Sequence, residues 1–114
     1  LLSMPSALTV KYIFYILIII AVLLEILADI LFKRWTIENK NTLLIIGLVI
    51  YTIGTLFWAF SLKYEYLSKA ISIFTLLNLI VISLVGILVF KEDLSMINKI
   101  GISLGALSII LIEI

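Results

Sequence analysis

Cysteine and histidine are both absent from this chain of 114 residues, and proline occurs only once. Without cysteine, neither disulfides nor thiol chemistry is available. Without histidine, the chain lacks the commonest metal ligand and the usual proton carrier near neutral pH. Any proton chemistry therefore falls to carboxylates, and we expect neither a metal site nor a cofactor.

Charged residues are also scarce, at 13%, whereas hydrophobic residues make up 65% of the chain. Soluble domains carry about 25% charged and about 45–50% apolar residues. This composition indicates an integral membrane protein whose first partner is the lipid bilayer. We expect no nucleic-acid partner and no enzyme, because the sequence contains no nucleophile–base arrangement or cofactor motif.

Four apolar stretches are long enough to cross a bilayer as helices. Short polar connectors join them and force neighbouring helices to run antiparallel. Four spans are too few to close a β-barrel. The sequence therefore predicts an all-α membrane domain over residues 12–114, with transmembrane helices at about 12–32, 43–61, 70–90 and 97–112. We set residues 1–11 apart as an N-terminal segment that is partly disordered or not native to the protein.

Two carboxylates, Glu25 and Asp29, interrupt the first apolar stretch. A charge at the centre of a membrane helix costs at least about 2.5–3.5 kcal/mol, and such acids usually mark ion or proton pathways. The two are four residues apart and share one helix face, with Lys33 one turn further on. We interpret them as a site that exchanges protons for a cation. The alternatives are an interfacial pair between Asp29 and Lys33, and a packing role for Glu25.

Aromatic and hydroxyl side chains follow one face of the second span. Tyr51, Thr55 and Trp58 are spaced by four and three residues, so they point the same way on a helix. Such a wall suits an organic cation through cation–π contacts. The alternative is ordinary packing, with Trp58 in the aromatic belt at the membrane surface.

The third span carries Phe74, Thr75 and Asn78, and we assign these residues to the same cavity together with Ala21 of the first span. Asn78 stands near the middle of its span and needs hydrogen-bond partners in hydrocarbon. Those partners are either the substrate or a neighbouring helix, since polar side chains also hold membrane helices together.

The fourth span contains small residues on one face, at Gly101, Gly105 and Ser108. Small residues let helices approach closely in lipid. We expect this face to be a dimer interface, with packing inside the subunit as the alternative. Lysine and arginine divide five against three between the two membrane sides, and this weak bias permits insertion in both orientations and hence an antiparallel dimer.

The layout resembles the small multidrug resistance family of the drug/metabolite transporter superfamily over residues 12–112. The resemblance rests on the membrane glutamate Glu25 within the stretch 21–33, on Tyr51, and on the segments 67–70 and 91–95. It implies that Glu25 is the carboxylate shared by protons and substrate. It also implies an antiparallel dimer with one central site, alternating access, and a place in a prokaryotic inner membrane.

The chain departs from that pattern at several positions. The family's tryptophan in the third span is replaced by Phe74 and the tyrosine one turn earlier by Ile71, while guanidinium exporters have serine where this chain has Gly54. Asp29 is an addition. Asn78 and the Ser-Lys-Ala segment are instead similar to related heterodimeric subunits that move a lipid-linked aminosugar, although those lack the membrane glutamate.

The first hypothesis is therefore a proton-coupled exporter of small organic cations that acts as a homodimer. Two carboxylates per chain would also suit a substrate with two positive charges. The alternatives are a subunit of a lipid-linked substrate flippase, working as a heterodimer, and a non-transporting assembly or regulatory subunit.

Overall fold

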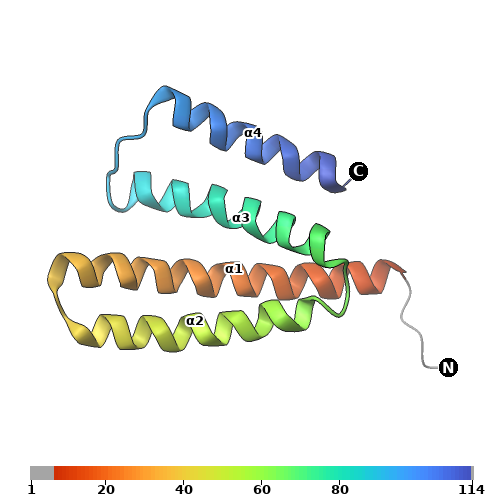
Figure 1. Cartoon of the computed structure of the whole chain (residues 1–114), viewed down its shortest axis with the longest axis horizontal. Coiled ribbons are helices and arrows are strands. Elements are labelled where there is room, and N and C mark those ends of the chain that lie inside the picture. The colour runs from red at the N-terminus through yellow and green to blue at the C-terminus, as the bar shows by residue number, and fades with distance from the viewer. Residues whose placement is uncertain (1–6, 114) are drawn as a thin grey trace. The chain divides into compact units, whose positions relative to one another are not determined.

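The computed structural model describes residues 7–113 and is helical through most of that range (Figure 1). Each helix is long and apolar enough to cross a membrane, at about 1.5 Å of rise per residue against roughly 30 Å of hydrocarbon. No strand occurs between residues 7 and 113. The predicted all-α membrane protein with four transmembrane helices is thus confirmed, and the helices are α1 (Ala7–Glu38), α2 (Asn41–Ser61), α3 (Leu67–Leu88) and α4 (Met96–Glu113).

The first helix differs most from its predicted span. α1 has 32 residues and begins at Ala7 instead of Tyr12, so residues 7–11 of the proposed N-terminal segment are helical, while residues 1–6 lie outside the described residues. It also continues to Glu38, through residues expected to form a connector. Charged residues there do not end the helix, because Arg34 Nε lies 3.0 Å from Glu38 Oε2 and such i,i+4 pairs stabilise helices.

A two-residue turn, Asn39 and Lys40, joins α1 to α2. Asn39 has a φ of 57°, a left-handed conformation that asparagine adopts more readily than most residues. Its N–H donates to the carbonyl of Trp35 at 2.8 Å, which caps the end of α1. Because the turn is so short, α1 and α2 lie side by side as an antiparallel pair (Figure 1).

Small residues repeat every seven positions where α1 meets α2. Ala21 and Ala28 of α1 are fully buried, and Gly47 and Gly54 of α2 are buried. A Cβ built on Gly47 would lie 3.5 Å from the carbonyl oxygen of Ala28, and one built on Gly54 would lie 3.5 Å from that of Ala21. Such residues let the two backbones approach closely, which favours helix association in lipid. We call this contact the α1–α2 seam.

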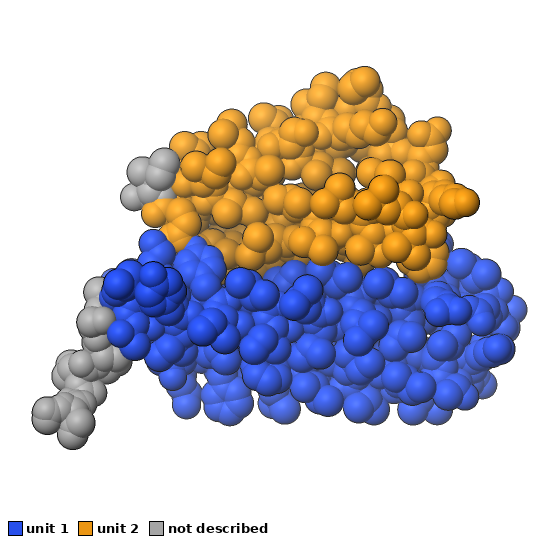
Figure 2. Space-filling model, turned by 180° about the vertical axis from the view of Figure 1, so that it is seen from behind, with its two compact units in different colours: residues 1–67 blue, residues 68–114 orange. Residues whose placement is uncertain are grey.

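The chain divides into two compact units, residues 1–67 and 68–114, coloured separately in Figure 2. The second unit contains α4 and nearly all of α3. Within it, a Cβ built on Gly105 would lie 3.5 Å from a methyl carbon of both Leu76 and Leu79. Lys69 Nζ, near the start of α3, lies 3.8 Å from Glu113 Oε1 at the end of α4. These contacts define α3 and α4 as an antiparallel hairpin.

The loop after α3 explains why this helix ends at Leu88, two residues before the predicted end. Lys91 has a left-handed φ of 54°, and the N–H of Glu92 then donates to the carbonyl of Gly86 at 3.0 Å. The carboxylate of Glu92 folds onto Gly86, where any Cβ would collide with it. The chain therefore turns back over the last turn of α3, where the flexible Glu92 side chain covers Gly86.

Candidate functional site

Several hydroxyl groups in the membrane-spanning helices donate to a carbonyl of their own helix. The side chains of Thr52, Thr55 and Ser72 donate to the carbonyl four residues earlier at 2.7–2.9 Å. Ser103 and Ser108 of α4 do the same at 2.9 Å. This local bond is a common solution for serine and threonine in helices. These hydroxyls therefore need no partner from another helix or from a ligand.

Glu25, Asp29 and Asn78 are different. Neither carboxylate has a hydrogen bond or an ion pair with another residue of the described chain, and Oδ1 of Asn78 is buried without a hydrogen-bond partner there. Both acids are half-buried. An unpaired acid in hydrocarbon is costly and usually functional, so these residues are candidates for binding a ligand.

Lys33 does not neutralise Asp29. It is exposed, and within residues 7–113 no ion pair joins the two side chains. The basic residues near this end of α1 are engaged elsewhere, since Arg34 and Lys40 lie 3.0 Å and 3.7 Å from the carboxylate of Glu38. The interfacial pair considered for Asp29 is therefore not formed.

Glu25 stands directly beside the α1–α2 seam. It follows Ala21 by four residues and precedes Ala28 by three, so it lies about 40° around α1 from Ala21. A Cβ built on Gly54 would be 3.6 Å from the backbone nitrogen of Glu25. Ala21, predicted to line the cavity, is instead fully buried in the seam.

Tyr51 occupies the matching position on α2. It follows Gly47 by four residues and precedes Gly54 by three, and it is therefore level with Glu25 along the seam. In an antiparallel pair, residues offset by four from the seam positions fall on the same side of both helices. The ring of Tyr51 lies 6.3 Å from that of Phe32, which is one turn after Ala28 on α1, so an aromatic pair lies along this part of the seam.

Thr55 and Trp58 continue the face that carries Tyr51. The Thr55 hydroxyl donates to the carbonyl of Tyr51 at 2.9 Å and keeps its lone pairs for a further donor. Trp58 is half-buried, and its carbonyl accepts a 2.6 Å bond from Ser61. These residues share the side of the seam on which Glu25 lies, and their role in binding stays a prediction.

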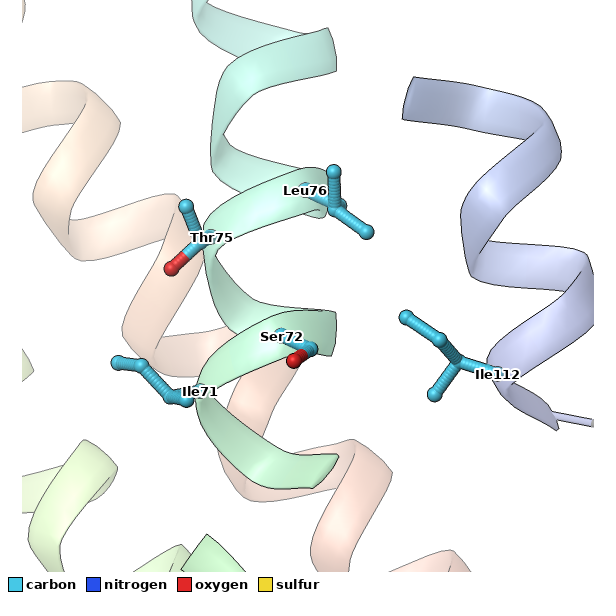
Figure 3. A pocket seen from close by; sticks show the side chains of 5 residues that line it. All are labelled: Ile71, Ser72, Thr75, Leu76 and Ile112. Atoms are coloured by element: carbon cyan, nitrogen blue, oxygen red, sulfur yellow. The ribbon is translucent and has the colours of Figure 1, made fainter. Parts of the chain in front are cut away.

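The predicted cavity residues of α3 lie in the second unit. Thr75 is exposed and lines an open groove of about 350 Å³ between α3 and α4, together with Ile71, Ser72, Leu76 and Ile112 (Figure 3). Phe74 and Asn78 are half-buried and line no part of this groove. Whether Phe74, Thr75 and Asn78 share a cavity with Glu25 stays a prediction.

The small residues of α4 have different surroundings. Gly105 packs against Leu76 and Leu79 of the same subunit, which is the alternative considered for this face. Gly101 has open space around its Cβ position and lines a second groove with Ser83 and Asn98. Gly105 is thus covered by α3, and the dimer-interface role of Gly101, Gly105 and Ser108 stays a prediction.

Two functional features escaped the sequence analysis. Gly47, Gly54 and the fully buried Ser61 form a seven-residue repeat that is visible in the sequence and marks the face of α2 toward α1. Phe32 was assigned only to the end of a span, although its ring reaches Tyr51. Among residues 7–113, no group of three or more acidic side chains could hold a metal ion.

The fold and the site together define a membrane protein with four spans, in which two acids without an ion-pair partner in the described chain lie beside the α1–α2 seam. The family model described as small multidrug resistance protein matches residues 13–104. The chain thus belongs to the small multidrug resistance family, as its sequence resemblance implied. It is a small multidrug transporter by family, and an integral membrane protein. No solved structure matches it.

Proposed function

We propose that this chain is a proton-coupled exporter of small organic cations that works by alternating access. Glu25 is the group that binds either a proton or the substrate. It has no salt-bridge partner in the described chain, so its charge is available to a ligand. This single observation, a membrane carboxylate kept free of basic neighbours, carries the proposal.

The surroundings of Glu25 support the choice of an organic cation. Tyr51 and Phe32 place aromatic rings on its side of the seam, and such rings attract cations that have shed part of their hydration shell. Hard metal cations would instead require six or more oxygen ligands. An organic cation is therefore the substrate class that this chemistry favours.

The working unit in this proposal is a homodimer in a prokaryotic inner membrane. A four-helix chain is a small enclosure for a water-filled path, and α4 presents large apolar side chains outward, with Leu104, Leu107 and Ile110 exposed by 53–59%. Two copies would supply two Glu25 carboxylates to one transport cycle. A proton taken from one side would then be exchanged for a cation from the other.

The test is proton-driven uptake into liposomes by the purified protein, with a panel of guanidinium, tetraethylammonium and 1,4-diaminobutane. We expect Glu25→Gln to abolish proton-driven uptake of every cation that the wild type carries, while the helical circular dichroism spectrum stays unchanged. Glu38→Gln is the matched control, because Glu38 is on the same helix but is exposed and ion-paired, and it should transport like the wild type.

Binding should also strengthen as the pH is raised, because a proton and a cation compete for one carboxylate. Isothermal titration at two pH values measures this competition. Full coupled transport by Glu25→Gln would contradict the proposal. If Glu25→Gln changes the stability of the oligomer, and the wild type transports none of the cations, a non-transporting subunit would be favoured instead.

A further inference from the structure

The second acid of α1 has no role in the proposal so far. Asp29 lies one turn beyond Glu25 on the same helix face, and side chains at this spacing are neighbours on the helix surface. Asp29 is half-buried, and neither Lys33 nor any other described residue forms an ion pair with it. It is therefore a second available negative charge at the same site.

The spacing of the two acids sets the kind of ligand that they can hold. Side chains four residues apart on a helix have Cβ atoms about 5–6 Å apart. A cation with a single charge at Glu25 leaves Asp29 as an uncompensated carboxylate in a membrane helix, which is unfavourable. A ligand with two charges at a similar spacing compensates both groups at once.

An aromatic pair, Phe32 of α1 and Tyr51 of α2, lies near the two acids along the seam. Tyr51 is level with Glu25, while its ring leans toward Phe32, one turn beyond Ala28. The aromatic pair therefore runs along the same stretch of the seam as the two acids. A linear ligand could lie along this stretch, with its charged ends at the acids and its methylene groups against the rings.

We propose that Asp29 binds the second ammonium group of a linear diamine whose first ammonium group is held by Glu25, which makes the transporter selective for dications. This inference rests on the proposed function, since it requires Glu25 to be the cation-binding residue. The preferred ligands are diamines with about three to five methylene groups between the nitrogens, to match the Cβ spacing of about 5–6 Å.

The experiment compares 1,4-diaminobutane with 1-aminobutane, which has the same carbon chain and one charge fewer. Affinities are measured by isothermal titration on the wild type, Asp29→Asn, Asp29→Glu and Glu25→Gln in liposomes. We expect the wild type to prefer the diamine by about tenfold or more. Asp29→Asn should lose this preference and bind both amines alike, with its affinity for 1-aminobutane changed by less than about threefold. Asp29→Glu, which keeps the charge, should retain the preference.

The outcomes separate this inference from the function on which it rests. If the wild type binds the two amines equally, and Asp29→Asn changes neither affinity, the role of Asp29 is overturned while Glu25-dependent binding of monocations upholds the transporter proposal. If Glu25→Gln binds and carries every cation like the wild type, both proposals fall. A circular dichroism spectrum and a size-exclusion profile for each variant identify any variant that fails to fold. If Asp29→Asn does not fold, the preference for the diamine over 1-aminobutane is compared between Asp29→Glu and the wild type instead.

Discussion

At the scale of single residues, Asn78 is the polar group of α3 whose role the structure sharpens. Its Oδ1 is buried and has no hydrogen-bond partner in the described chain, and leaving a buried acceptor unsatisfied costs about 1–3 kcal/mol. If the carbonyl is kept for a substrate donor, Asn78→Leu should unfold at the same or a higher denaturant concentration than the wild type, while its transport rate falls. Unfolding in detergent and uptake into liposomes measure the two effects separately.

The opposite pattern would identify Asn78 as a helix–helix contact. A loss of stability of about 1 kcal/mol or more in Asn78→Leu, as expected when a made hydrogen bond is removed, would show that Oδ1 has a protein partner in the folded membrane protein. Ser103→Ala is a suitable control, because the Ser103 hydroxyl donates to the carbonyl of Lys99 in its own helix. That variant should change neither stability nor transport.

The same scale explains why the acids could be predicted from the sequence. Carboxylates are rare in apolar membrane-spanning runs because they are costly there, so Glu25 and Asp29 stand out without a structure. The surroundings of Ala21 could not be predicted in this way. Alanine suits a cavity wall and a tight seam equally well, and only the position of Gly54, 3.5 Å from the Ala21 carbonyl oxygen when extended by a Cβ, decides for the seam.

At the scale of helices, the α1–α2 seam depends on the absence of a side chain at Gly54. A Cβ there would lie 3.1 Å from Cβ of Leu24, an atom that is fixed to the backbone of α1 and cannot rotate away. We expect Gly54→Ala to destabilise the protein by about 1–3 kcal/mol through overpacking. This loss should exceed the gain of about 1 kcal/mol that alanine brings over glycine in a helix.

Gly101→Ala is the matched control for that variant. Gly101 also lies within a membrane-spanning helix, but its Cβ position faces open space within the described chain, with no atom within 4 Å beyond its own neighbours and nearby helix backbone, so alanine should be tolerated or slightly stabilising. Unfolding of both variants in sodium dodecyl sulfate titrations, followed by circular dichroism, gives the comparison. Equal stabilities for Gly54→Ala and Gly101→Ala would be incompatible with a tight seam at Gly54.

The helices themselves were predictable to different degrees. The bounds of α2 and α4 fall within two residues of the predicted spans, because apolar runs end there at polar turns. α1 was predicted too short, because charged residues at its end were interpreted as a connector, whereas the ion pair of Arg34 with Glu38 continues the helix. The seven-residue repeat of small residues in α2 is visible in the sequence, but the α1 residues that these small residues contact can be identified only from the structure of the α1–α2 pair.

At the scale of the whole molecule, α4 is the membrane-spanning helix with the smallest buried share, 6% of its span against 11–33% for the others, which leaves apolar surface for a second copy. Its side toward α3 is occupied at Gly105. Its outer side carries Ile97, Leu104 and Leu111 at seven-residue intervals, exposed by 79%, 59% and 65%. In a membrane, such a row faces either lipid tails or another protein, and a seven-residue repeat is the spacing of helix pairs that pack along their length.

Cysteine cross-linking distinguishes these environments and also gives the direction of pairing, since the natural chain contains no cysteine. Leu104 lies at the middle of α4, so Leu104→Cys should form a disulfide-linked dimer whichever way two copies of α4 run. In an antiparallel homodimer, Ile97→Cys mixed with Leu111→Cys should cross-link, while each variant alone should not. In a parallel dimer, Ile97→Cys alone and Leu111→Cys alone should each cross-link, while the mixture should form no additional cross-link between the two variants. Gly105→Cys, which faces α3, is the negative control. Failure of Leu104→Cys to cross-link in liposomes would show that this face of α4 contacts lipid and not a second copy.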